Sequence, residues 1–109
     1  MATIYKVLGQ SAPASTSADL YTVPAATDTV VSTINACNTH ASNSATIDIA
    51  VRVGGSSIAT KDYLVKGLAL AAGSTFTYTA GVTLDATDVI TVVSSTNDVA
   101  FAAFGSEIS

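Results

Sequence analysis

The sequence predicts an all-β fold: an antiparallel β-sandwich, jelly-roll-like, with about eight short strands in a single domain spanning residues 1–109. Two observations predict it. Segments rich in Val, Ile and Thr recur at intervals of roughly 8–12 residues, and Gly, Pro, Asn and Ser separate them. Helix signals are weak throughout. A chain of 109 residues suits one domain, and its folded surface should measure about 5,600 Å².

The clearest strand is Ala45–Val53, where apolar and other residues alternate without interruption. Its Ile and Val residues fall on one side, which indicates one face in a core and one in solvent. Asp48 and Arg52 share the outward side, four residues apart, which is too far for direct contact along one strand. We therefore expect each of them to pair across strands. The glycine pair after Val53 should end the strand.

The remaining strands are expected in segments 3–9, 20–23, 29–37, 61–73, 74–80, 89–95 and 98–105. Pro24 should stop the second strand, because its ring nitrogen cannot donate a ladder hydrogen bond. Segment 61–73 also fits a short helix by its Leu and Ala content, but Gly67 would cost about 1 kcal/mol there. We favour a strand with Leu64, Leu68 and Leu70 on one side.

The tripeptide Ala-Thr-Asp occurs twice, ending at Asp28 and at Asp88, each time directly before a Val-rich run. Asp side chains stabilise turns by accepting hydrogen bonds from backbone N–H groups two residues on. We therefore interpret Asp28 and Asp88 as turn-fixing residues at matching corners. The flanking residues do not align, so the tripeptide does not indicate an internal repeat.

Charged residues are scarce, at 11% of the chain against about 25% in ordinary soluble domains. Hydrophobic residues make up 49%. An exterior with so few charges favours a surface that copies of the chain, or another protein, partly cover. The alternative is a monomer with a Thr-rich exterior. The four basic residues do not cluster and the net charge is −4, so we expect neither nucleic acid nor an anionic membrane as a partner.

Catalytic and metal-binding patterns are weak. The one cysteine, Cys37, and the one histidine, His40, allow no disulfide and no usual zinc site within a chain. The two could touch at a strand end, but no nucleophile motif surrounds them. Asp85 and Asp88, with Asp28 nearby, could bind calcium, although a turn-capping role fits them better. The sequence predicts no enzyme, no cofactor and no metal site.

Two further features bear on location and ligands. The first residues lack an apolar signal core, and the longest apolar run, Val99–Phe104, is too short to span a membrane. This predicts a protein made in a cytoplasm. The four tyrosines raise the possibility of sugar stacking, but the chain has no Trp and they are dispersed along it: Tyr5, Tyr21, Tyr63 and Tyr78.

Several segments carry a resemblance to a known family: "YKVLGQSAP" near the start, "LYTVPAATDTVVSTINACN", "IAVRVGGSSIATKDYLV" and "TLDATDVITV" in between, and "AFGSEIS" at the end. Together they cover nearly the whole chain. They resemble a family of small virion structural proteins of tailed phages, familiar from marine and cyanobacterial phages. The resemblance implies a non-enzymatic component of the virion, made in the host cytoplasm and present in many copies.

These expectations give three functional hypotheses. The first is a capsid decoration, or cement, protein bound to the major capsid protein on the outer capsid surface as a homo-oligomer, with a trimer favoured. The second is a tail, neck or fibre-attachment component, and the third is a glycan-binding module on the virion. Because terminal strands can add to a neighbour's sheet, we predict an assembly interface at Ile4, Tyr5, Val7, Phe104, Glu107 and Ile108.

Overall fold

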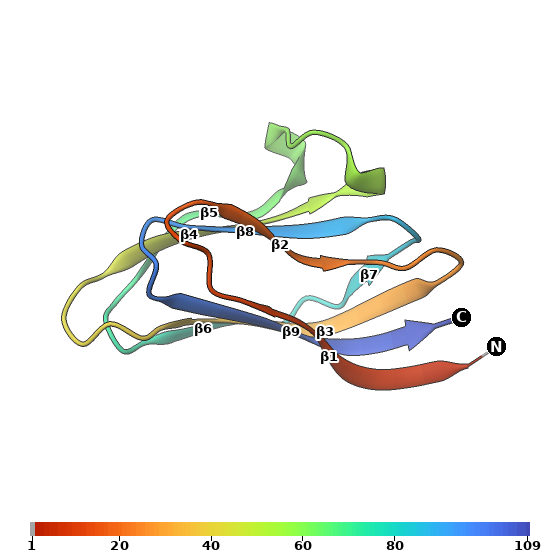
Figure 1. Cartoon of the computed structure of the whole chain (residues 1–109), viewed down its shortest axis with the longest axis horizontal. Coiled ribbons are helices and arrows are strands. Elements are labelled where there is room, and N and C mark those ends of the chain that lie inside the picture. The colour runs from red at the N-terminus through yellow and green to blue at the C-terminus, as the bar shows by residue number, and fades with distance from the viewer. Residues whose placement is uncertain (1) are drawn as a thin grey trace.

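The computed structural model describes residues 2–109 and forms a sandwich of two antiparallel sheets (Figure 1). The strands are β1 (Thr3–Ser11), β2 (Ser17–Thr22), β3 (Asp28–Asn38), β4 (Ala45–Arg52), β5 (Tyr63–Leu70), β6 (Thr75–Tyr78), β7 (Val82–Leu84), β8 (Val89–Ser94) and β9 (Val99–Ile108). Two short 3₁₀ turns, η1 (Val53–Gly55) and η2 (Thr60–Asp62), lie between β4 and β5. The accessible surface is 5447 Å², close to the predicted value.

The strand order confirms the predicted sandwich and is that of a rolled-up hairpin. The lower sheet of Figure 1 has the order β1-β9-β3-β6, with β7 also paired to β3, and the upper sheet has the order β2-β8-β4-β5. If β6 and β7 are taken as one interrupted strand, the first strand pairs with the last, the second with the next to last, and so on inward. This nesting is the jelly-roll arrangement. Strand β7, only three residues long, was not predicted.

The core lies between the sheets and is filled by the inward positions of both. The largest fully buried side chains are Phe101, Ile34, Ile47, Ile49 and Ile90. Both termini lie side by side at one end of the sandwich (Figure 1), where the backbones of Ala2 and Ser109 exchange two hydrogen bonds of 2.7 and 2.9 Å.

Strand β5 confirms the prediction of a strand in the segment that also fitted a helix, but one part of that prediction is wrong. Lys66 and Gly67 bulge out opposite Asp48, whose Oδ1 oxygen accepts the Gly67 N–H at 2.7 Å. Two residues oppose one here, and this one extra residue reverses the side to which the following side chains point. Leu68 packs against the core, whereas Leu64, expected on the same side, is exposed.

Strand β4 has the predicted alternation from Ala45 to Ile49, whereas Ala50, expected in solvent, is buried. Its two charged residues pair across strands as expected. Asp48 forms an ion pair with Lys66 on β5, at 3.1 Å, and Arg52 forms one with Asp19 on β2, at 3.0 Å. Val53 departs from the prediction because the strand ends at Arg52. Its side chain lies in η1, outside the sandwich, and is 66% exposed.

Candidate assembly surface

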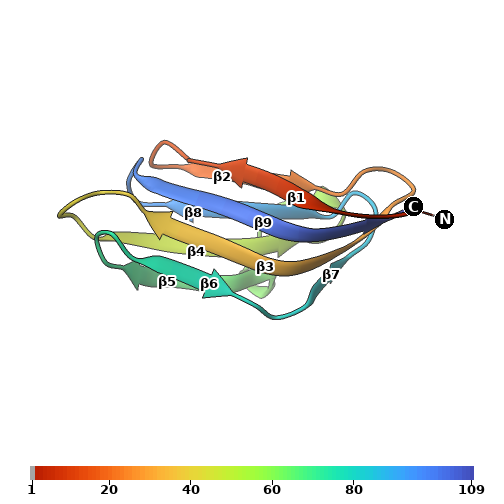
Figure 2. The same cartoon turned by 90° about the horizontal axis from the view of Figure 1, so that it is seen from below.

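The outward side of the lower sheet, which faces the viewer in Figure 2, is called here the lower face, and it is nearly free of charge. Strand pairing places directly opposed residues on the same side of a sheet, so the registers define which residues share this face. Asp28 is its single charged residue among those the structure describes. The lower face comprises Thr3, Tyr5, Val7, Gln10, Asp28, Val30, Ser32, Thr33, Asn35, Cys37, Thr75, Thr77, Thr83, Ala100, Ala102, Phe104, Ser106 and Ile108.

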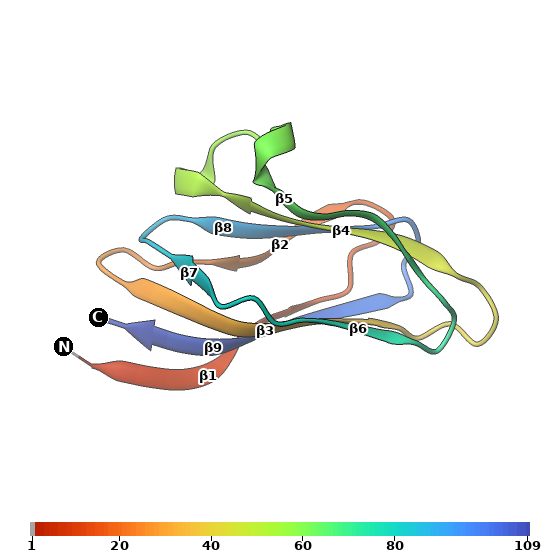
Figure 3. The ribbon, with the colours of Figure 1, turned by 180° about the vertical axis from the view of Figure 1, so that it is seen from behind.

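The outward side of the upper sheet is different. Together with the turns η1 and η2, which project beyond it in Figures 1 and 3, it carries six charged residues in three ion pairs. The pairs are Arg52 with Asp19, Lys61 with Asp62, and Lys66 with Asp48. A paired, charged exterior is suited to water, whereas the lower face resembles the core of a protein–protein interface, from which charged residues are depleted.

Strand β1 forms an open edge beside the lower face. The double hydrogen bond between Ala2 and Ser109 fixes the alternation of the β1–β9 ladder. In an antiparallel ladder every second residue turns its N–H and C=O groups away from the partner strand. These residues are Thr3, Tyr5 and Val7, whose backbone groups therefore point to the free side. The strand presents an unpaired backbone that another chain can extend.

The other sheet edges are short or interrupted. Strand β6 has only four residues. Strand β2 is broken by a bulge at Leu20 and carries Asp19, and β5 is broken by the Lys66 bulge. Short edges, bulges and charges are the features by which proteins prevent unwanted strand pairing. Of the edges in residues 2–109, β1 has the least such protection over Thr3–Val7.

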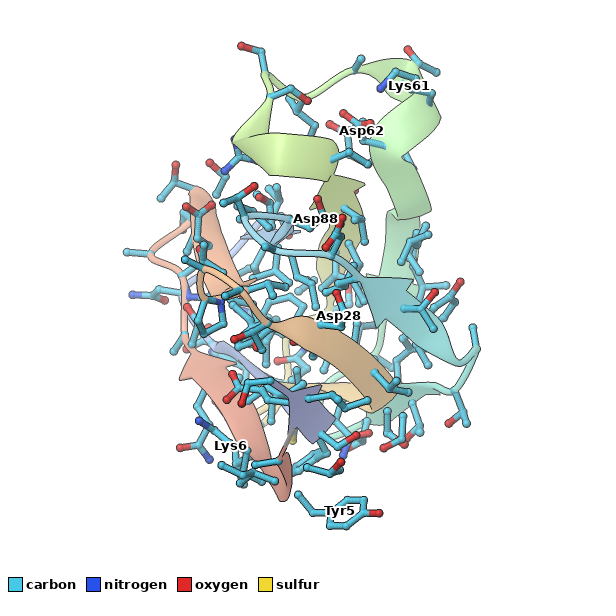
Figure 4. All side chains as sticks on the ribbon, turned by 90° about the vertical axis from the view of Figure 1, so that its right-hand side faces the viewer. Tyr5, Lys6, Asp28, Lys61, Asp62 and Asp88 are labelled. Atoms are coloured by element: carbon cyan, nitrogen blue, oxygen red, sulfur yellow. The ribbon has the colours of Figure 1, made fainter. Side chains whose placement is uncertain are left out.

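The six residues predicted as an assembly interface all lie on the β1–β9 pair. Tyr5, Val7, Phe104 and Ile108 are on the lower face, and Figure 4 shows Tyr5 projecting away from the body of the molecule. Ile4 and Glu107, which oppose each other, lie on the inner side. Tyr5 is 83% exposed and Ile4 53%. The structure thus brings the six together, and their role as an interface stays a prediction.

Glu107 instead belongs to a polar cluster that joins the two sheets at the end where the termini lie. The Tyr21 hydroxyl on β2 donates to the Oε2 oxygen of Glu107 at 2.5 Å and lies 2.8 Å from the Thr29 hydroxyl on β3. Lys6 on β1 contacts the Oε1 oxygen of Glu107 at 3.3 Å. The cluster therefore holds the open strand β1 and its partner β9 against the upper sheet.

The ionisation of this cluster follows from its contacts. The hydrogen bond from Tyr21, helped by Lys6, lowers the pKa of Glu107 below its usual 4.5. Burial, followed by the bond to Glu107, raises the pKa of Tyr21 to about 12. The cluster thus favours a charged carboxylate beside a neutral phenol.

We expect this cluster to make stability depend on pH at both extremes. Because the folded-state pKa of Glu107 is lowered, its contribution to the free energy of unfolding is complete above pH 4.5. This contribution is lost as pH falls through the folded-state pKa. The raised pKa of Tyr21 gives a contribution that is complete below 10 and is lost as pH rises toward 12. Tyr21→Phe should reduce the free energy of unfolding by about 1 kcal/mol at pH 7.

Urea unfolding at pH 3, 7 and 11 checks this expectation. Glu107→Gln should reduce the change in the free energy of unfolding between pH 7 and pH 3, which we call the acid limb, because it removes the titrating carboxylate. It should leave most of the change between pH 7 and pH 11, because it keeps an acceptor for Tyr21. An unchanged acid limb in Glu107→Gln would show that other carboxylates dominate acid unfolding.

The two aspartates predicted to fix turns differ in the structure. Asp88 is buried, and its carboxylate accepts the N–H of Asp85 at 2.9 Å and that of Gly54 at 2.8 Å. Asp88 therefore stabilises its own turn by binding a residue three positions earlier, whereas the sequence predicted a partner two positions later. Its bond to Gly54 also anchors η1. None of the hydrogen bonds among residues 2–109 involves the carboxylate of Asp28, which is exposed at the start of β3.

The two Ala-Thr-Asp turns nevertheless lie next to each other. The Val23 N–H donates to the Asp88 carbonyl at 2.9 Å, and the Thr87 N–H donates to the Val23 carbonyl at 3.1 Å. Asp28, Asp85 and Asp88 line one hollow of about 410 Å³ at this end. Within residues 2–109, however, no group of three or more acidic, His or Cys side chains is arranged to hold a metal ion.

His40 and Cys37 have separate surroundings. The Nδ1 nitrogen of His40 accepts the backbone N–H groups of Ser42 and Asn43, at 3.0 and 2.9 Å, so the ring organises its own loop. Cys37 lies on the lower face, opposite Thr75 of β6. The ring nitrogen that could serve as a base is thus engaged by the loop backbone.

A hollow on the upper sheet contains the polar side chains most suited to a sugar. It measures about 270 Å³ and is lined by Ser17, Asp19, Arg52, Ile58, Tyr63, Thr91 and Val93. Three of its members are already engaged, since Asp19 accepts hydrogen bonds from both Arg52 and Thr91. The Lys66 ammonium lies 4.8 Å from the centre of the Tyr63 ring, so one ring face is occupied.

A further hollow lies on the lower face. It measures about 560 Å³ and is lined by Gln10, Ser11, Ala12, Asn35, Cys37, Thr75, Ala100, Phe101 and Ala102. Most of these residues are small and none is charged. The side-chain oxygen of Asn35 is buried and lacks a hydrogen-bond partner, the one such atom in the described part of the chain.

Comparisons with known proteins found no matching family model, no matching curated protein and no matching solved structure. Within residues 2–109, no helix is both long and apolar enough for a membrane span.

Proposed function

We propose that this chain is a structural protein of a phage virion, a capsid decoration protein that assembles through the lower face and the β1 edge. The observation that carries the proposal is the contrast between the two sides of the sandwich. One side has three ion pairs, and the other has a single charged residue, Asp28, and exposed Tyr5, Val7 and Val30.

The sequence resemblance supports the same proposal independently. The segments "YKVLGQSAP" and "AFGSEIS", which carry it most specifically, contribute most of β1 and the end of β9. These are the two strands that form the open edge and the uncharged terminal part of the lower face. In a decoration protein they would contact the major capsid protein or a neighbouring copy.

The open edge can be tested by removing one outward N–H group. Thr3→Pro deletes an N–H that points away from β9, so the ladder with β9 stays intact, while Thr3→Val keeps that N–H as the control. We expect both variants to fold with similar melting temperatures. Binding of Thr3→Pro to particles that lack the protein should be weaker by about tenfold. Equal binding of the two variants would exclude strand addition at β1.

Location and copy number test the function itself. Quantitative mass spectrometry of purified particles should find hundreds of copies, with the protein on heads separated from tails. The alternative, a tail, neck or fibre-attachment component, predicts a small multiple of three or six and bare heads. That result would replace the decoration role while keeping a virion structural protein.

The hollow that contains Tyr63 and Arg52 favours a second candidate, a glycan-binding module on the virion. Its hydroxyl, carboxylate and guanidinium groups are of the kinds that hydrogen-bond sugars. A glycan array with purified protein tests it, and Arg52→Met should abolish any signal. Absence of binding at millimolar sugar would remove this candidate.

A further inference from the structure

The hollow on the lower face contains an unsatisfied acceptor. A buried carbonyl oxygen without a partner costs about 1–3 kcal/mol, and native proteins contain few of them. The Oδ1 oxygen of Asn35 is in this state. Because the terminal torsion of Asn is broad, a modest rotation would turn this oxygen toward a donor seated in the hollow. The small residues Ala100 and Ala102 leave space there.

The same face carries a side chain that matches this hollow. Tyr5 is 83% exposed, the most exposed of the large hydrophobic residues that the structure describes. It projects from β1 (Figure 4) and combines an apolar ring with a hydroxyl donor. It is uncharged, as are all residues that line the hollow. Tyr5 cannot reach the hollow of its own chain, because it lies too far along β1. Tyr5 pairs with Ser106, whereas Gln10, at the rim of the hollow, pairs with Ala102.

The spacing of these two features suits a two-fold pair. Five positions along β1 correspond to about 16 Å. A two-fold axis that lies in the plane of the interface, midway between Tyr5 and the hollow, places each Tyr5 over the other copy's hollow. This midpoint falls close to Val7 and Phe104, which oppose each other on β1 and β9. Such an interface is self-complementary, as two-fold contacts require.

Charge and size agree with a second copy as the occupant. Each chain carries a net charge of −4, so two copies repel least where they meet through a face with few charges, which is the lower face. This face extends along the 47 Å long axis and the 21 Å short axis of the molecule, seen in Figure 2. That leaves room for the roughly 800 Å² per partner of a standard interface.

We propose that two copies of this chain pair through their lower faces, with the Tyr5 ring of each copy in the hollow of the other and its hydroxyl donating to the Oδ1 oxygen of Asn35. This inference rests on the proposed self-association and specifies its contact and symmetry. The inference predicts a homodimer, whereas the sequence alone favours a homotrimer.

Sedimentation equilibrium of the full chain tests the pairing, over protein concentrations from about 1 to about 200 µM. Tyr5→Phe removes two symmetry-related hydrogen bonds, so the dimer dissociation constant should rise about 25-fold. Tyr5→Ala should raise it by more than about 100-fold. Tyr63→Phe, the same change on the upper sheet, is the matched control and should leave it unchanged.

A double-mutant cycle tests the specific contact. Asn35→Leu removes the acceptor, and in that background Tyr5→Phe should have almost no further effect. If Asn35→Leu does not fold, the comparison of Tyr5→Phe with Tyr63→Phe still decides. A monomer over the whole range, a trimer, or a dimer insensitive to Tyr5→Ala would overturn the proposal. A monomer that still decorates heads in hundreds of copies would overturn the pairing and leave the proposed function standing.

Discussion

Gly105→Ala is expected to destabilise the fold by about 3 kcal/mol or more, the cost of inserting an atom where packing leaves no room. Gly105 lies in β9 opposite Val31 and next to the bulge at Ser32 of β3. A Cβ atom there would overlap the carbonyl group of Val30 and crowd the Cα atom of Val31. These are backbone atoms of a central strand, so they cannot move without breaking the β3–β9 ladder.

Gly73→Ala is the matched control for this prediction. Gly73 has a φ of 71°, but a Cβ atom there would meet nothing within 4 Å. Its cost should be limited to the left-handed backbone, about 1 kcal/mol. Urea unfolding of the two variants separates the effects. Equal losses would mean that the close approach of β3 and β9 is not what requires glycine at position 105.

Asp88→Ala is expected to cost about 3 kcal/mol, because it leaves the N–H groups of Asp85 and Gly54 without their charged acceptor. Both η1 and the turn before β8 should become looser. The effect should appear as a lower free energy of unfolding and as faster hydrogen exchange at those two amides.

Asp28→Ala is the control that the sequence itself provides, since Asp28 ends the other copy of the same tripeptide. Its carboxylate is exposed at the start of β3, so the change should stay within about 0.5 kcal/mol. Similar losses in the two variants would show that both aspartates fix turns, as the sequence alone predicts.

The sequence predicts most of the fold because two-residue periodicity and turn residues act locally. The alternation in β4 is enough to place Ile47 and Ile49 in the core and to send Asp48 and Arg52 to partners on other strands. The short β7 escapes prediction because three residues cannot establish a period. The side predicted for Leu64 is wrong because a bulge depends on the partner strand. Here it depends on the hydrogen bond from the Gly67 N–H to Asp48.

The candidate site is less predictable for a related reason. The terminal strands can be named from the sequence, but which of their residues share a face depends on register. Glu107 was predicted in the interface, yet it points inward to Tyr21 because it opposes Thr29 and Ile4. Asn35 gave no signal at all, since its unpaired oxygen is a property of the folded surroundings. Asp28 and Asp88 were predicted to play the same role in matching turns, but they differ because only Asp88 faces η1.

Hydroxyl-radical footprinting of the protein, first as the monomer diluted below the dissociation constant of the pair and then assembled on the particle, tests most directly whether the lower face is the assembly surface. The oxidation rate of Tyr5, now 83% exposed, should fall severalfold on assembly together with those of Phe104 and Ile108. Tyr63 and Leu64, on the upper sheet, should keep their rates. Protection of Tyr63 and Leu64 with Tyr5 still reactive would contradict the account.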